Sequence, residues 1–211
     1  MPEDTRSLLP EKETLILDAA QRRFAVYGLN KVTMDEIASD IGMGKASLYY
    51  YFPTKEDLYK GVIQREQREF LRRLQEILPL DISAGDKLKR YVEQRLSYFA
   101  ELVNLQLLSM HSWINTRPLF RDLFESFASQ ELKYLTEILR VGRKSGEFDV
   151  RSPETTALLI LHALQGLRLR AARAAEFQMH HGEISKEVER EMRQFVELLL
   201  RGLCKISSQR E

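Results

Sequence analysis

The chain has 211 residues, of which 44% are hydrophobic and 30% charged, and its formal net charge is +1. This composition is that of a globular protein and excludes a long disordered tail. The longest nearly apolar stretch, residues 157–164, is far shorter than the ~20 residues that cross a bilayer, so no membrane span is predicted.

The amino terminus is charged from Glu3 onward and has no apolar core of signal-peptide length, which indicates a cytoplasmic protein. The single cysteine, Cys204, excludes an internal disulfide and any multi-cysteine metal site. We expect Cys204 to be a small buried hydrophobic residue, with a regulatory thiol as the alternative.

The first predicted helix spans about residues 11–27 and ends at Gly28, which suits a left-handed cap. Its apolar residues recur at spacings of three and four: Leu15, Ile16, Ala19, Ala20, Phe24 and Tyr27. A second helix begins after Thr33, where T-M-D-E is the pattern of a capping box, and ends at Gly42. A third, very short helix follows at about 45–51, since Pro53 prevents its simple continuation.

Thr54 and Asp57 form a second capping pattern, which predicts a long and largely polar helix over about 54–78. Longer amphipathic helices are expected at about 84–113, 118–144, 153–176 and 185–206. Ser152 and Ser185 are the expected N-caps of the last two, and no segment alternates as a strand would. The sequence therefore predicts an all-α protein.

The second and third helices and the turn at 42–44 span about twenty residues, the size of a helix-turn-helix that places its second helix in the DNA major groove. Ala38 is small where two helices must cross, Gly42 suits the turn, and Leu48 is the expected core anchor of the third helix. Residues 1–60 carry eight Lys/Arg and ten Asp/Glu, so DNA binding must depend on where the cations lie.

The run I-A-S-D-I-G-M-G-K-A-S-L-Y-Y-Y-F-P-T-K-E-D-L, residues 37–58, resembles the signature of the TetR/AcrR family of transcriptional regulators, and the resemblance extends over about 12–60. It implies an N-terminal three-helix DNA-binding domain over 1–55 joined by the 54–78 helix to a larger helical bundle. That bundle, 79–211, is expected to bind an effector and to dimerise.

Four consecutive aromatic residues cannot all face one core at 100° per residue, so some of Tyr49, Tyr50 and Tyr51 must point outward, while Phe52 is expected to pack inside. The resemblance places Tyr49 against bases and backbone, and Tyr50 and Tyr51 against phosphate. The other expected DNA contacts are the cations at two helix starts, the groove-facing pair and the capping threonine: Lys45, Lys55, Ala46, Ser47 and Thr33.

A DNA-binding domain this small makes few contacts with DNA. It is therefore expected to act as a homodimer on a quasi-palindromic operator. By the same resemblance, the last two helices form the dimer interface. Val188, Met192, Phe195, Val196, Leu199 and Leu203 give the final helix an apolar stripe that suits either this interface or the core of one chain.

A small-molecule effector that releases a repressor is expected to meet polar-tipped or aromatic residues within apolar stretches. The candidates are His111, Trp113, Phe127, His162, Gln165 and Arg168. No catalytic motif, metal site or cofactor site is predicted. The alternative function is a helical protein-interaction module without sequence-specific DNA binding.

Overall fold

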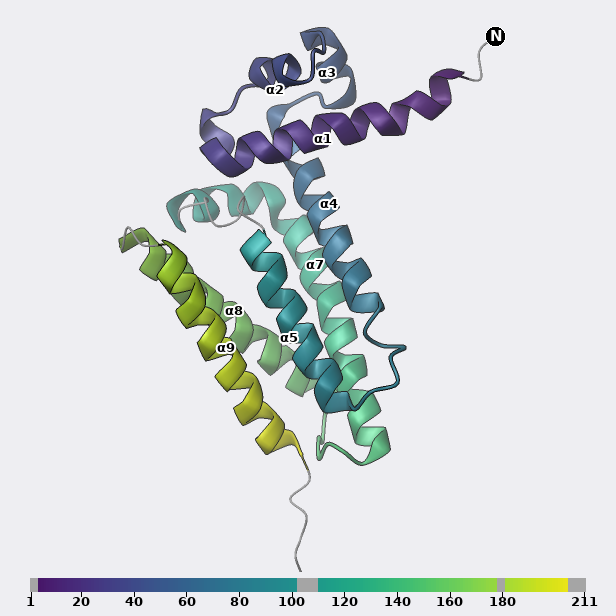
Figure 1. Ribbon diagram of the computed structural model, residues 1–211, viewed down its shortest axis with the longest axis vertical. Helices are drawn as coiled ribbons and strands as arrows, with labels where there is room; N and C mark the ends of the chain where they lie inside the picture. The colour runs from purple at the N-terminus through teal and green to yellow at the C-terminus, as the bar shows by residue number, and fades with distance from the viewer. Residues whose placement is uncertain (1–3, 102–109, 178–180, 205–211) are drawn as a thin grey trace, which may run out of the picture. The chain divides into compact units, whose positions relative to one another are not determined.

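The computed structural model describes residues 4–101, 110–177 and 181–204, with side chains placed within 11–97, 121–167 and 190–204. This described part is all helical, as predicted, apart from turns and one isolated bridge between Phe148 and Cys204 (Figure 1). None of its helices is long and apolar enough to span a membrane.

The chain divides into two compact units. The first comprises residues 1–68 and 102–115, and the second comprises 69–101 and 116–211. The division falls inside the fourth helix, between residues 68 and 69, whereas the whole of 54–78 was predicted to be a linker.

The first unit contains α1 (Asp4–Lys31), α2 (Met34–Asp40), α3 (Lys45–Tyr51) and the beginning of α4 (Lys55–Gln75). Helix α1 starts earlier than predicted, but its backbone breaks at the expected Gly28, which has a φ of 75°. Glycine reaches this left-handed region without the steric cost of a side chain. Two of the apolar residues that recur along α1, Leu15 and Tyr27, are exposed.

The capping box of α2 is present as predicted. The Glu36 backbone N–H donates to the Thr33 hydroxyl, and the Thr33 backbone N–H donates to the Glu36 carboxylate at 2.8 Å. Gly42, with a φ of 61°, makes the turn toward α3, and α3 has the predicted bounds. Thr54 caps α4 through the Asp57 backbone N–H at 3.0 Å.

The core of the first unit lies between α1, α2, α3 and α4. Phe24 of α1 and Tyr59 of α4 meet edge to face with ring centroids 5.1 Å apart. Burial raises the pKa of the Tyr59 hydroxyl above its ordinary value. Leu48 and Phe52 are buried as predicted, together with Ile16, Ala20, Ile37, Ala38, Leu58 and Val62.

The second unit holds the end of α4, α5 (Ala84–Glu101), most of α7 (Met110–Ser145), α8 (Pro153–Phe177) and α9 (His181–Leu203). The predicted helix over 84–113 is wrong, because residues 110–113 already belong to α7. The predicted start at residue 118 is also wrong: α7 begins at Met110 and continues through Pro118, although an interior proline removes one backbone hydrogen bond.

Helix α8 begins at Pro153 as predicted, and Ser152 accepts a hydrogen bond from the Thr155 backbone N–H at 3.2 Å. Helix α9 begins at His181, so the prediction that Ser185 caps it is wrong: Ser185 lies inside the helix. Helices α8 and α9 pack against each other, and α9 also packs against α5.

A buried polar cluster joins α5 to α7. The Tyr91 hydroxyl donates to the Glu131 carboxylate at 2.8 Å, and the Arg95 guanidinium forms an ion pair with the same carboxylate. The side chains of Arg95 and Glu131 are only 2% and 1% exposed. Burial raises the pKa of Tyr91, so its hydroxyl remains a donor. Separating α5 from α7 would leave a buried charge without its partner, which is strongly unfavourable.

Gly142 of α7 lies directly against the buried ring of Phe148. A Cβ atom at position 142 would be 2.1 Å from Phe148 Cδ2, much closer than van der Waals contact. We predict that Gly142→Ala lowers the free energy of unfolding by about 1–3 kcal/mol through overpacking, measured by urea denaturation.

The matched control is Gly202→Ala in α9, where no atom lies within 4 Å of the added Cβ. It should be neutral or slightly stabilising, because alanine favours helix over glycine. Equal stability of the two variants would contradict the assigned contact.

The prediction that Cys204 is buried is wrong: its thiol is exposed. Leu203, the last residue of α9, turns inward and is buried, and its carbonyl accepts from the Asp149 backbone N–H at 2.7 Å. The next residue therefore directs its side chain to solvent.

Candidate nucleic-acid interface

Helix α3 presents a sharp contrast between its two sides. Leu48 and, just after the helix, Phe52 are buried and anchor it to the first unit. Ala46, Ser47, Tyr49 and Tyr50 are exposed, with Tyr50 77% accessible to solvent. The alternation follows from the 100° step of the helix, so one short helix carries both an anchor and an outward surface.

The three tyrosines differ in their surroundings. Tyr50 and Tyr51 contact each other edge to face with ring centroids 5.5 Å apart, and Tyr51 is half-buried. Tyr49 is 39% exposed, and the Lys45 ammonium lies 5.9 Å from its ring centroid. This is the distance of a cation–π contact. Each tyrosine therefore has a defined ring position, which limits where its hydroxyl can donate.

Lys45 at the start of α3 is paired with an acidic residue of α2. Its ammonium donates to the Asp35 carboxylate at 2.9 Å, and both side chains are about three-fifths exposed. This hydrogen bond raises the pKa of Lys45. Lys45 was predicted from the sequence as a DNA contact, whereas its pairing with Asp35 was not predicted.

The N-terminal turn of α2 carries negative charge. The Thr33 hydroxyl donates to Glu36 at 2.8 Å and would have to leave that carboxylate to reach a phosphate. Hydrogen bonds from the Thr33 backbone and hydroxyl lower the pKa of Glu36, so the carboxylate is ionised. The second acidic residue of this turn is Asp35.

Lys55, the other predicted phosphate contact, is half-buried at the start of α4. Its ammonium donates to the backbone carbonyl of Val32 at 3.0 Å. Val32 immediately precedes the cap of α2, so Lys55 ties the first turn of α4 to the entry of the helix-turn-helix. Its charge remains available to a nearby phosphate because a carbonyl does not neutralise it.

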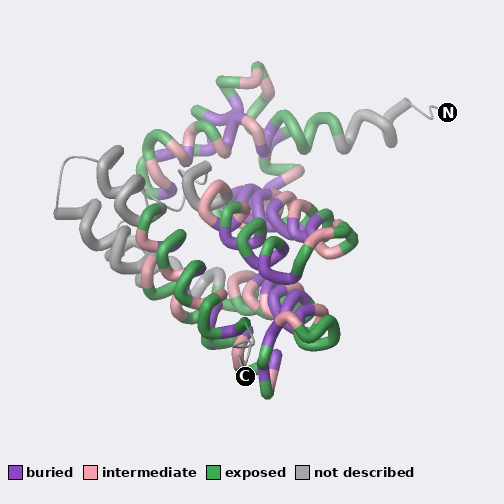
Figure 2. Tube along the Cα trace, turned by 60° about the horizontal axis from the view of Figure 1, so that its bottom comes forward, coloured by how far each residue is buried: buried purple, intermediate pink, exposed green. Residues whose placement is uncertain are grey.

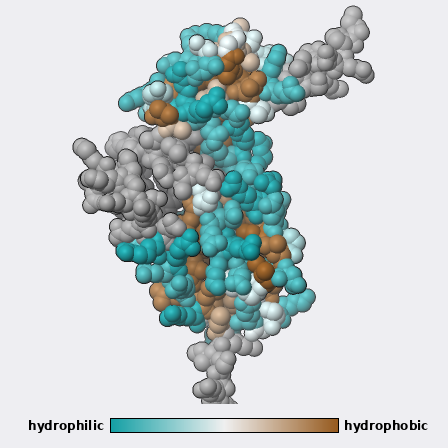
Figure 3. Space-filling view, viewed as in Figure 1, coloured by the Kyte–Doolittle hydropathy of each residue, from teal (hydrophilic) through white to brown (hydrophobic). Residues whose placement is uncertain are grey.

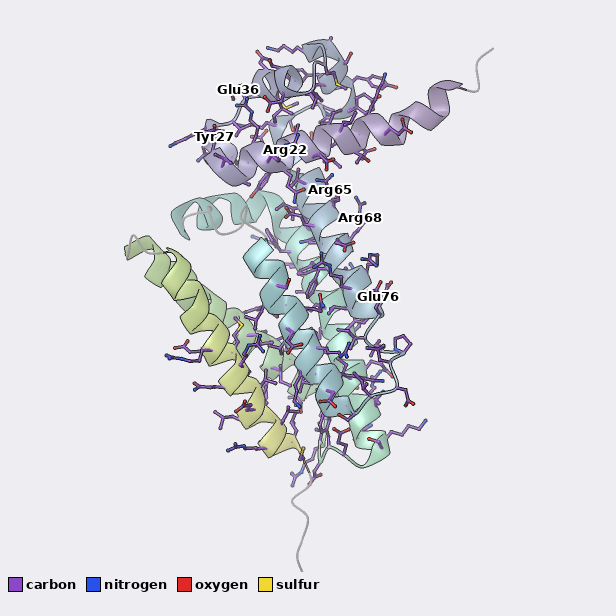
Figure 4. The ribbon with its side chains drawn as sticks, viewed as in Figure 1. Arg22, Tyr27, Glu36, Arg65, Arg68 and Glu76 are labelled. Atoms are coloured by element: carbon purple, nitrogen blue, oxygen red, sulfur yellow. The ribbon has the colours of Figure 1, made fainter. Side chains whose placement is uncertain are left out.

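Polar pairs hold α1 against the rest of the first unit. Arg65 of α4 donates to Asp18 at 2.7 Å, and Gln21 of α1 donates to the buried Glu66 at 2.6 Å. Arg23 donates to Asp40 at the end of α2 at 2.6 Å, which lowers the pKa of Asp40. Figure 4 shows Glu36 on α2 and Arg65 on the part of α4 beside α1.

The six predicted effector contacts are not brought together by the described side chains. Phe127 is buried on α7, with its ring 5.6 Å from that of Phe70. His162 and Gln165 are exposed on α8. His111, Trp113 and Arg168 lie in described helices, but their side chains are outside the described set.

The buried cluster of Tyr91, Arg95 and Glu131 was not predicted from the sequence. The sequence does contain a pattern that indicates this cluster, because Leu88, Tyr91, Val92 and Arg95 recur at the spacing of one helix face. A charged residue at such a position indicates a buried pair.

Residues 16–62 match the family model described as "Bacterial regulatory proteins, tetR family". A crystal structure of a transcriptional regulator from Cytophaga hutchinsonii is 38% identical, covers 92% of this chain and 99% of that chain, and superimposes with a TM-score of 0.82.

The "Uncharacterized HTH-type transcriptional regulator YhgD" of Bacillus subtilis is 22% identical over 84% of this chain and 90% of its own length. A crystal structure of a putative transcriptional regulator from Saccharomonospora viridis, solved in complex with choline, is 23% identical and has a TM-score of 0.74. It covers 93% of this chain and 99% of that one, and shows the same fold. The chain belongs to the TetR family and is a DNA-binding transcriptional regulator.

Proposed function

We propose that the chain is a repressor that binds a quasi-palindromic operator as a homodimer and is released from it by a small molecule. The outward side of α3 is the observation that carries this proposal. Ser47, Tyr49 and Tyr50 are exposed on a helix whose opposite side is fixed by Leu48 and Phe52. Such a helix can enter the major groove without disturbing the core.

Within this surface the residues have different roles. Ser47, beside Ala46, reads base edges, since a hydroxyl can donate or accept there. Tyr49 lies against bases and backbone, while Tyr50 and Tyr51 bind phosphate and set the register. Lys45 and Lys55 supply the cations, and Thr33 is the remaining candidate for a phosphate contact.

The second copy is proposed to bind along α8 and α9. Leu159 of α8 and Leu198 of α9 are 64% and 66% exposed in one chain, and Leu158 is 40% exposed. Figure 2 shows long exposed and intermediate stretches along the described part of α9. Met192, Val196 and Leu203, part of the stripe expected on the last helix, are buried in the chain's own core. The exposed leucines therefore remain for a partner.

On α8, Leu159, His162 and Gly166 recur at the spacing of one helix face. No atom lies within 4 Å of a Cβ built on Gly166, so a neighbouring helix could approach closely there. His162 and Gln165, both exposed, suit this face better than an internal pocket.

The effector is proposed to bind within the second unit, with Phe127 as the described apolar contact and Arg168 as a further candidate. His111 and Trp113 belong to the first unit and are separate candidates. The choline complex of the Saccharomonospora viridis regulator supports a small-molecule site in this fold.

The experiment is to recover genomic fragments with the purified full-length protein and to titrate the recovered duplexes. We expect an affinity at least about a thousandfold tighter for an operator than for unrelated DNA, and an affinity that falls steeply with salt. A DNA affinity that does not change with salt concentration, or the recovery of no preferred fragment, would contradict the proposal.

Ser47 and Tyr50 should differ in what their loss changes. Ser47→Ala is expected to relax the preference at one base position by about 1–3 kcal/mol. Tyr50→Phe removes a phosphate donor and should weaken operator and unrelated duplex alike. Competition titrations on single-base operator variants measure both. A uniform loss for Ser47→Ala would reject its base-reading role.

A further inference from the structure

The proposed DNA-binding surface is not uniformly favourable to DNA. The face of the first unit seen in Figure 3 carries both hydrophilic and hydrophobic areas. The proposed surface also contains a carboxylate: the Asp35 side chain lies 2.9 Å from the Lys45 ammonium, which in turn lies 5.9 Å from the exposed Tyr49 ring. The first cation of α3 thus has an internal counterion.

We propose that Asp35 is an affinity-limiting residue that holds Lys45 away from the phosphate backbone and thereby keeps sequence-independent DNA binding weak. The inference rests on the proposed function, because it needs α3 to face DNA. Asp35 itself makes no favourable contact with DNA in this scheme; it acts through Lys45 and through its own charge.

Asp35 is expected to lower the affinity for DNA in two ways. A phosphate that binds Lys45 must compete with the Asp35 carboxylate for the same ammonium. A phosphate placed beside Lys45 also lies close to the negative charge of Asp35, and like charges repel across a few ångströms. Both effects are independent of base sequence, so they weaken binding to any duplex.

Asp35 is also dispensable for the local fold. The capping box of α2 is formed by Thr33 and Glu36, and Asp35 takes no part in it. Its side chain is 61% exposed. Asparagine at this position keeps the shape and removes the charge, with only a small loss of favourable interaction with the helix dipole.

The test compares wild-type protein with Asp35→Asn on a random-sequence duplex, so that no operator is needed. We expect the variant to bind about twofold to thirtyfold more tightly, the range that follows from releasing one exposed ion pair in each of the two DNA-binding domains of a dimer. The slope of log affinity against log salt, taken between about 50 and 200 mM, should become steeper. The increase should correspond to at most about one additional phosphate contact in each DNA-binding domain.

Two further variants test whether the effect of Asp35→Asn depends on its ion pair with Lys45 or only on the change in net charge. Asp81→Asn makes the same charge change at an exposed residue of the second unit and should leave affinity unchanged. In a Lys45→Ala background, Asp35→Asn should gain much less than it does alone, since the cation it releases is gone.

The inference is overturned if Asp35→Asn binds no more tightly than wild type, or if it gains as much in the Lys45→Ala background. An equal gain for Asp81→Asn would overturn it too. These results leave the regulator function standing, whereas a wild-type protein that shows no salt-dependent duplex binding removes both. Thermal unfolding of each variant verifies that the fold is kept.

Discussion

Glu131→Ala is expected to destabilise the protein by about 3–5 kcal/mol, because it leaves the Arg95 guanidinium buried without its carboxylate. The Tyr91 hydroxyl loses its acceptor in the same step. Urea denaturation followed by circular dichroism measures the change, and helical content should be lost at a clearly lower urea concentration.

Glu137→Ala is the control on the same helix. Glu137 pairs with Arg140 at 3.5 Å on the surface, so its loss should change stability by less than about 1 kcal/mol. If the two alanine variants unfold at the same urea concentration, the buried cluster does not stabilise the fold as described. Replacing the whole cluster with apolar residues should be less damaging than removing Glu131 alone.

Leu159→Glu is expected to give a monomer that has lost at least about 100-fold of its operator affinity. The exposed Leu159 would be buried by the proposed partner, and a charge there would be desolvated without a counterion. A monomer binds one half-site at a time, so it loses the additional affinity that comes from linking two DNA-binding domains in a dimer. Light scattering gives the oligomeric state, and duplex titration gives the affinity.

Gln130→Glu adds the same charge to an exposed position of α7 and should remain a dimer with wild-type affinity. Leu198→Glu, on the neighbouring helix, should reproduce the effect of Leu159→Glu. A Leu159→Glu protein that is still dimeric would place the interface elsewhere.

The helix-turn-helix was predictable because its boundaries depend on local chemistry. Thr33 and Glu36 cap α2 through contacts only three residues apart, and Gly42 adopts a backbone conformation that few other residues tolerate. These signals are complete within a short window. The bounds of α3 were accordingly predicted to the residue.

The larger unit was predicted less well, since its helix ends depend on packing. Pro118 suggested a helix start, yet α7 continues through it, and Ser185 suggested a cap, yet α9 begins at His181. A cap-forming residue or a proline only permits a boundary. Whether the chain uses it depends on contacts made by residues distant in sequence.

The electrostatics of the candidate interface was the least predictable part. Asp35 and Lys45 are ten residues apart on different helices, and the sequence gives no sign that they pair. Lys55 likewise reaches Val32 across 23 residues. A family pattern can therefore predict which lysines lie at the interface, but the residue that pairs with each lysine depends on the fold.

The exposed thiol of Cys204 makes the protein directly suited to spectroscopy. It is the one cysteine in the sequence, so a maleimide dye or nitroxide would attach at a single position beside the end of α9 without any substitution. In a twofold assembly each label would have one counterpart. Dipolar coupling between them would then report a distance within the assembly, with and without DNA.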